Sequence, residues 1–327
     1  MKTWSHIGKL LLVPALLLSQ FTAHAWGFYG HRKINYMAVF LLPPEMMLLY
    51  KSQIDFLSEH AVDADKRRYA VAAEAPRHYI DIDRYGTYPY PNLPRRWDSA
   101  VAKFSEDTLQ AHGIVPWWVQ IMQRRLTEAF KERDQARILR LSADIGHYIS
   151  DAHVPLHACS NHNGQYSNQL GIHAFWESRV PELFAESNYD FLIGKAVYIR
   201  NPGSFIWDRV LESALAADSV LKVEAALSKQ FPEDAKFSYE ERMGKIQRQY
   251  STAFSKAYET QLRGMIERRM RQSIFAVASF WYTAWVDAGQ PDLRYLVNKQ
   301  FSATDEKEFN EMNAQWQKGK PLGKICD

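Results

Sequence analysis

The sequence predicts an all-α protein with a single multi-helix domain, and three observations carry this prediction. Apolar residues recur at helical spacing in several long windows, and convincing strand alternation is absent. Clusters of Pro, Gly and Asn separate these windows in the way that loops separate helices. The 13% aromatic content favours a substantial core, as an α-helical domain of this length needs.

The predicted helices follow the apolar windows in chain order. They are expected at residues 37–50, 115–130, 136–154, 207–227 and 242–288, the last with a break. Pro155 ends or kinks the third of them. Residues 85–94 and 160–171 are expected to form loops long enough to carry function. The final 40 residues, rich in Lys, Glu, Asn and Gln, predict a peripheral helix and a loose tail.

The first 25 residues have the organisation of a secretory signal peptide. Lys2 and Lys9 precede an apolar run, and Ala23-His24-Ala25 follows it as a small-x-small cleavage signal. The run is short and interrupted by Pro14, which argues against a retained membrane anchor. Cleavage after Ala25 would leave residues 26–327 as the mature domain, with no integral membrane segment. A secreted or periplasmic location is therefore expected.

Charge and cysteine content constrain the function only weakly. The formal net charge falls from +3 to +1 when Lys2 and Lys9 leave with the signal peptide, so bulk charge does not predict nucleic-acid binding. Cys159 and Cys326 allow at most one internal disulfide, and their spacing does not decide whether they pair. Nothing in the sequence implies a stable protein partner.

Two histidine–carboxylate pairs are the strongest chemical signal in the sequence. His147 and Asp151 lie four residues apart, and His173 and Glu177 repeat that spacing. On a helix, residues i and i+4 share one face, so each pair can bind one metal ion. With His157 as a third ligand, the second pair has the nitrogen and oxygen donors of catalytic zinc, with one position left open for water.

An upstream segment supplies further candidate ligands. Residues 60–83 supply Asp63, Asp65, His78, Asp81 and Asp83 as candidates. Cleavage before Trp26 would also free an α-amine, which together with the carbonyl of the same residue can chelate a metal ion. His31 is close enough in sequence to join that site. The alternative interpretation of Trp26 is an ordinary aromatic core residue.

The order Trp, His, Asp, His, H-x₃-D-x₅-H and H-x₃-[DE] over residues 26–180 resembles the S1/P1 nuclease and zinc-dependent phospholipase C superfamily. Its members are helical proteins that bind three zinc ions, so the resemblance implies one domain around a trinuclear zinc cleft. It implies three sets of ligands, namely Asp63, His78, His147 and Asp151; His157, His173 and Glu177; and Trp26, His31 and Asp151. Asp63 is preferred to Asp65 because the family aspartate tends to precede another acidic residue.

The resemblance also implies a mechanism and two substrate classes. Paired ions that share Asp151 would lower the pKa of a bridging water for attack on a phosphodiester, with Asp63 orienting that water or accepting its proton. Trp26-Gly27 and the D-x-H-x-P-L-H motif at 151–157 favour a nuclease for single-stranded nucleic acid. Tyr85, Tyr88, Tyr90 and Tyr166 are then candidates to stack on bases. Glu177 favours a phospholipase C, with Phe28, Tyr29 and Phe175 near the acyl chains. A third hypothesis is a non-catalytic, zinc-stabilised helical binding protein.

Overall fold

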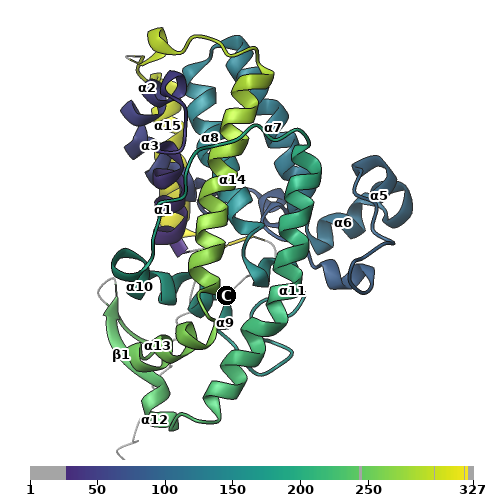
Figure 1. The fold of residues 1–327 in the computed structure, drawn as a ribbon, viewed down its shortest axis with the longest axis vertical. Coiled ribbons are helices and arrows are strands. Elements are labelled where there is room, and N and C mark those ends of the chain that lie inside the picture. Colours follow the sequence, from purple (N-terminus) through teal and green to yellow (C-terminus); the bar gives the residue numbers. More distant parts are fainter. Residues whose placement is uncertain (1–26, 243–244, 298, 320, 323–327) are drawn as a thin grey trace, which may run out of the picture.

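The computed structural model describes residues 27–242, 245–297, 299–319 and 321–322 (Figure 1). Within them the chain is all-α apart from one small hairpin, which confirms the predicted fold class. The segment expected to be a signal peptide, the proposed ligand Trp26 and Cys326 lie outside the described residues. No described helix combines the length and the apolar character needed to cross a membrane.

The elements follow one another along the chain, with the longest connections between η3 and α5, between η4 and α9, and between α10 and α11. The α-helices are α1 (Gly27–Val39), α2 (Pro44–Ser52), α3 (Ile54–Glu59), α4 (Asp63–Arg67), α5 (Trp97–Phe104), α6 (Glu106–His112), α7 (Val115–Glu132), α8 (Gln135–Asp151), α9 (Ile172–Ala174), α10 (Val180–Asn188), α11 (Pro202–Ser228), α12 (Glu233–Lys236), α13 (Thr252–Gln261), α14 (Met265–Asp287) and α15 (Ala303–Lys318). Shorter helical turns are η1 (His60–Val62), η2 (Ala72–Arg77), η3 (Ile82–Tyr85), η4 (Pro155–Ala158), the π-helical η5 (Phe175–Arg179) and η6 (Arg294–Leu296). The strands are β1 (Phe237–Arg242) and β2 (Lys245–Tyr250).

Long helices make the core, and α14 runs through its centre (Figure 1). It packs against α1, α7 and α8, while α11 packs against α7 and η4. Side-chain hydrogen bonds join these helices inside the core. Trp281 of α14 donates to the Ser142 carbonyl of α8 at 3.0 Å, and Gln123 of α7 donates to the Phe280 carbonyl at 3.1 Å. Such bonds satisfy buried polar groups that would otherwise weaken the core.

The first predicted helix window is only partly right. Instead of one helix at 37–50, α1 ends at Val39 and α2 begins at Pro44, because consecutive prolines at 43 and 44 cannot continue a helix. The window also missed most of α1. The buried face of that helix includes Gly27, Gly30, His31 and Asn35, which do not register as an apolar stripe.

The window at 242–288 contains the strand β2 and the helices α13 and α14. The sequence had shown no convincing strand pattern, so this strand was not predicted. β1 and β2 pair antiparallel, with Phe237 opposite Tyr250 and Glu241 opposite Ile246. The alternation in each strand is short and rich in charged residues, which hides it from a search for apolar periodicity. The expected break lies between α13 and α14, where Arg263 and Gly264 adopt left-handed conformations.

Gly146 is a glycine in the middle of α8 that the packing requires. A β-carbon there would overlap the side-chain amide of Asn35. That amide is fully buried and donates to the carbonyls of Leu57 and Ala143, both at 3.1 Å. The contact lets α1 approach α8 beside His147, and so it helps to place the candidate site.

We therefore expect Gly146→Ala to destabilise the protein by about 1–3 kcal/mol, even though alanine is the better helix former. The measurement is urea unfolding of metal-free protein. Gly203→Ala in α11 is the matched control, because the close contacts of its new methyl group are with the flexible end of Gln120, which can move, and with Asn201 Oδ1 at 3.4 Å. A Gly146→Ala protein as stable as the wild type would show that Asn35 does not constrain this helix contact.

Candidate metal centre

The end of α8 is the part of the fold around which the candidate ligands gather. His147 and Asp151 occupy the last two turns of that helix and are fully buried. The chain then turns into η4, which carries His157. The turn is held by Ser213, which donates to the Ala152 carbonyl at 2.8 Å, and by Arg269, which donates to the His153 carbonyl at 2.7 Å. These bonds satisfy carbonyls that the helix end leaves without intrahelical partners.

The first donor group lies between α8 and the segment after η2. His78 Nδ1 lies 3.0 Å from Asp151 Oδ2 and 3.0 Å from His147 Nε2. His147 Nε2 lies 3.2 Å from the same Asp151 oxygen. Tetrahedral zinc with nitrogen and oxygen ligands holds its donor atoms about 3.3 Å apart, so these three atoms converge at the spacing that one ion requires.

The second donor group is formed by η4, α9 and η5. His173 Nε2 lies 3.0 Å from Glu177 Oε2 and 3.1 Å from His157 Nε2. His157 Nε2 is 3.6 Å from the same Glu177 oxygen. The His173–Glu177 spacing predicted a shared helix face, and the structure keeps the two side chains together across the π-helical η5. Such π-helical turns are frequent at functional sites.

Asp151 joins the first group to His31, which lies on the other side of its carboxylate. Its Oδ2 faces His78 and His147, whereas its Oδ1 lies 3.5 Å from His31 Nε2 and 3.9 Å from His157 Nδ1. The His31 ring stacks on the His147 ring with 3.8 Å between centroids. Both ring nitrogens of His31 lack a hydrogen-bond partner among the described residues. His31 is therefore available to a ligand on the side of Asp151 that faces away from His78.

Backbone carbonyls determine which nitrogen of three of these histidines faces inward. Nδ1 of His147 donates to the backbone carbonyl of Ala61 at 2.8 Å. Nδ1 of His157 donates to the backbone carbonyl of His78 at 2.5 Å, and Nδ1 of His173 to that of His162 at 3.1 Å. A carbonyl oxygen can only accept, so each Nδ1 carries a proton and each Nε2 is the nitrogen directed at the cluster, which in the neutral ring has the lone pair that binds a metal ion. This is the arrangement of histidines that bind metal ions.

The electrostatics of the cluster attract positive charge. Burial raises the pKa of the Asp151 carboxyl, but the charges on His147 and His157 and the hydrogen bonds from His147 and His78 hold it well below its usual range. Burial lowers the pKa of His147, yet Asp151 and Asp65 bring it to about 9. Burial, assisted by His147, lowers the pKa of His31 to about 3, so that its imidazole is neutral. Ionised carboxylates beside a neutral imidazole suit a bound cation.

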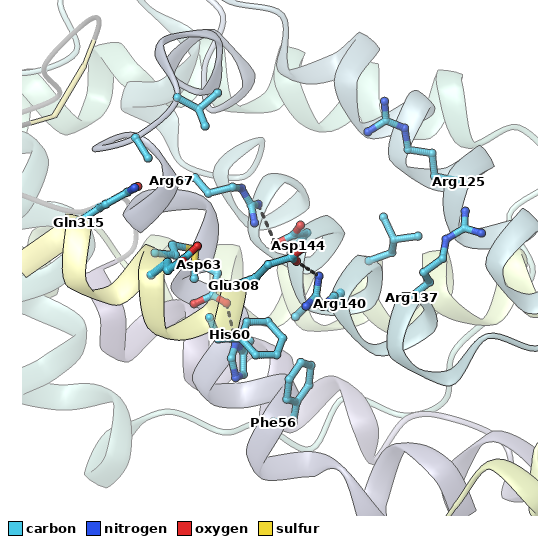
Figure 2. Close-up of a pocket in the computed structure, with 17 residues that line it drawn as sticks. Phe56, His60, Asp63, Arg67, Arg125, Arg137, Arg140, Asp144, Glu308 and Gln315 are labelled. Atoms are coloured by element: carbon cyan, nitrogen blue, oxygen red, sulfur yellow. Dashed lines mark hydrogen bonds and ion pairs between the residues drawn. The ribbon is translucent and has the colours of Figure 1, made fainter. Parts of the chain in front are cut away.

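The structure brings together all the predicted ligands that it describes except Asp63. The carboxylate of Asp63 accepts hydrogen bonds from His60 at 2.5 Å and from Lys66 at 3.1 Å. It points into a separate cavity of about 530 Å³ between α4, α8 and α15, where Figure 2 shows it beside His60. Neither of its two contacts is a member of the donor groups.

Asp65 instead occupies the place expected for Asp63. Its Oδ1 lies 3.7 Å from His147 Nε2 and 3.8 Å from His78 Nδ1, and it groups with His31 and His147 as a third potential metal site. The sequence contained the signal for Asp65, since both aspartates were candidates. Residues two apart on a helix point to different sides, so only one of them could face the histidines.

The sequence did not predict the part that two other acidic residues near the site play in the structure. Glu74 is fully buried and lies 3.6 Å from His78 Nε2; its position four residues before His78 repeats the spacing of the two recognised pairs. Asp83 was a candidate ligand, but its carboxylate accepts from the backbone and hydroxyl of Ser160 at 2.9 and 2.5 Å. Asp83 thus anchors the loop at 160–171 beside η3.

A helical fold that gathers buried histidines and carboxylates into three groups, each able to hold a metal ion, defines a protein with a candidate metal centre. The family model described as S1/P1 Nuclease matches residues 26–279, and the chain belongs to this family. Membership places it among the nuclease-type hydrolases of phosphodiester bonds. No curated protein gives a significant match to the chain. α15, which closes the cavity beside Asp63, lies beyond the matched residues.

Proposed function

We propose that the protein is a zinc-dependent, S1/P1-type nuclease that hydrolyses single-stranded nucleic acid. The observation that carries the proposal is the position of Asp151, whose two oxygens face separate donor groups in a chain of this family. Two metal ions that share one carboxylate form the arrangement used to stabilise both the attacking and the leaving oxygen of a phosphodiester.

We assign three zinc ions to the donor groups. Asp65, His78, His147 and Asp151 would hold the first, and His157, His173 and Glu177 the second. Trp26, His31 and Asp151 would hold the third, supported by the two His31 nitrogens without a hydrogen-bond partner among the described residues. The nitrogen and oxygen donors suit zinc, and the three protein ligands at His157, His173 and Glu177 leave a position for water.

Zinc bound at these positions supplies Lewis acidity and lowers the pKa of water to near neutrality. The residues of the chain hold and orient this chemistry. Asp151 directs one oxygen to the first donor group and the other to His31, and the carbonyls of Ala61, His78 and His162 fix the ring orientation of three histidines. The buried side chains surrounding them exclude bulk water, which strengthens electrostatic interactions at the site.

An exposed aromatic side chain on the loop that contacts His173 supports a nucleic-acid substrate. Tyr166 is 67% exposed in the 160–171 loop, and Arg84 of η3 donates to its hydroxyl at 3.1 Å. Aromatic rings beside a cationic group favour the stacking of unpaired bases. In contrast, Phe175, a candidate for contact with acyl chains, is buried and stacks on Tyr250 with 3.8 Å between centroids. The contrast favours a nuclease over a phospholipase C.

We also propose that residues 1–25 are a signal peptide and that 26–327 is the mature, exported domain. This proposal is linked to the third ion, because cleavage before Trp26 creates the amine that would bind it. An exported location without a lipid-attachment cysteine corresponds to the periplasm or the medium.

We expect the mature protein beginning at Trp26 to release mononucleotides from single-stranded DNA when zinc is present and to lose this activity after chelation. Release is measured by chromatography, and activity should return when zinc is added back. Vesicles of phosphatidylcholine serve as the second substrate. Release of phosphocholine but not of nucleotides, from protein that retains its zinc, would replace the nuclease with a phospholipase C. A zinc-loaded protein inactive on both would favour the non-catalytic alternative.

A further inference from the structure

His78 differs from three other histidines of the cluster in the group that lies next to its outward-facing ring nitrogen. In His147, His157 and His173 the nitrogen that faces away from the cluster donates to a backbone carbonyl. In His78 the orientation is reversed, because Nδ1 faces Asp151 and Nε2 points outward. The group facing Nε2 is a carboxylate, Glu74 Oε1, at 3.6 Å, which is ion-pair distance, and Nε2 has no hydrogen-bond partner among the described residues. A carboxylate at this place is a stronger acceptor than a carbonyl.

The two oxygens of Glu74 have different partners. Oε2 accepts a hydrogen bond from Arg77 at 2.5 Å and lies 3.5 Å from Arg67 Nε. Oε1 accepts from the Tyr148 hydroxyl and faces His78. The arginines supply the positive charge that a fully buried carboxylate needs. Because they occupy Oε2, Oε1 is directed towards the histidine.

The surroundings of Glu74 are rigid, so its carboxylate can fix the direction of a ring. Arg77 stacks over Trp118 at 4.0 Å from the ring centroid. Arg67 forms an ion pair with Asp144 of α8 at 2.8 Å, drawn as a dashed line in Figure 2. Tyr148 adjoins His147 in α8, and its ring meets the His78 ring edge-on with 5.4 Å between centroids. Glu74 is therefore tied both to α8 and to the segment that carries His78.

We propose that Glu74 is a positioning residue, which orients His78 by accepting the proton of its Nε2 and so keeps Nδ1 directed at the first metal ion. This carboxylate–histidine arrangement fixes the tautomer and increases the basicity of the metal-binding nitrogen. Glu74 itself touches neither the metal ion nor the substrate. The inference rests on the proposed function only in placing an ion at His78.

The test is zinc binding by the full mature chain carrying Glu74→Gln. We expect the dissociation constant of one zinc ion to rise about 10- to 100-fold, with the remaining ions unaffected. The amide keeps the size of the carboxylate but removes its charge. Binding is measured by competition with a chromogenic chelator, and the number of bound ions by mass spectrometry, so the readout does not depend on turnover.

Glu224→Gln is the matched control. Glu224 is a second buried carboxylate in a comparable network, with Lys236 at 2.8 Å and with Ser228 donating at 2.7 Å, but it contacts none of the proposed ligands. We expect this variant to lose stability and to bind zinc like the wild type. A weakening of zinc binding as large as that in Glu74→Gln would mean that Glu74 acts only through general stability, and would overturn the proposal.

Glu74→Asp tests the same contact if Glu74→Gln does not fold. It keeps the charge next to Arg67 and Arg77 but withdraws the oxygen from His78 by one methylene, so weaker zinc binding with normal folding is expected. Normal zinc affinity in this variant, or in a folded Glu74→Gln, would refute the role of Glu74. If the Glu74 variants bind zinc more weakly but the wild-type protein has no nuclease activity, only the proposed function is contradicted. If the wild-type protein is a nuclease but the Glu74 variants bind zinc as tightly as it does, only this inference is contradicted.

Discussion

Asp151→Asn is expected to lower nuclease activity by at least about 10²–10³-fold, the scale found when a group that stabilises developing charge is removed. The carboxylate of Asp151 has one oxygen on the side of His78 and His147 and the other on the side of His31 and His157. An amide keeps the shape but loses the negative charge that two cations would share. We also expect fewer zinc ions per chain, measured by mass spectrometry of the purified variant.

Asp144→Asn is the control for this prediction. Asp144 lies seven residues earlier on α8, and its carboxylate forms an ion pair with Arg67 outside the donor groups. Because Arg67 also contacts Glu74, this variant should lose stability and bind zinc more weakly, but it should lose far less zinc and activity than Asp151→Asn. If Asp151→Asn kept its full zinc content and its turnover, the shared carboxylate would not be part of the metal centre, and the proposed mechanism would fail.

Asp65→Asn and Asp63→Asn should have opposite consequences, although the two positions are separated by one residue. Asp65 faces His147 and His78, so its replacement is expected to reduce zinc affinity and activity by about 10- to 100-fold. Asp63 is paired with His60 and Lys66 instead. Its replacement should cost about 1 kcal/mol of stability and leave the zinc content unchanged.

The comparison requires zinc titration, single-stranded DNA hydrolysis and urea unfolding on both variants. Each variant is the other's control, since both change one aspartate to asparagine in the same short helix. Loss of zinc in Asp63→Asn with normal binding in Asp65→Asn would restore Asp63 as the ligand. In that case the orientation of α4 in the metal-loaded protein would have to differ from the one described here.

The local pattern of the sequence was enough to predict most of the candidate site. Histidine and carboxylate at i and i+4 must share a helix face, so the pairs His147–Asp151 and His173–Glu177 followed directly from their spacing. Pro155 predicted that His157 would leave the axis of α8, and η4 carries it to the second donor group. These relations span a few residues and depend only on backbone geometry.

The choice between Asp63 and Asp65 depended on contacts that local geometry does not contain. α4 is a single short turn, and its rotation determines which aspartate faces inward. That rotation is held by neighbours, since His60 and Lys66 bind Asp63 and the ring of Trp316 in α15 lies 5.7 Å from the Lys66 ammonium. The partners of Glu74 come from η2, α4 and α8, so its role was also invisible in the sequence.

Local sequence patterns predicted the helical class, the helices α7, α8, α11, α13 and α14, and the residues proposed to bind metal ions apart from the choice between Asp63 and Asp65. Periodicity and residue chemistry are local properties, which is why they could be recognised without coordinates. Three features could not be predicted from local patterns, namely the pairing of β1 with β2, the contact of α1 with α8 through Gly146 and Asn35, and the orientation of Asp65 towards the histidines. These features arise from packing between segments far apart in the chain, where the free energy of burial selects one orientation among several that are locally equivalent.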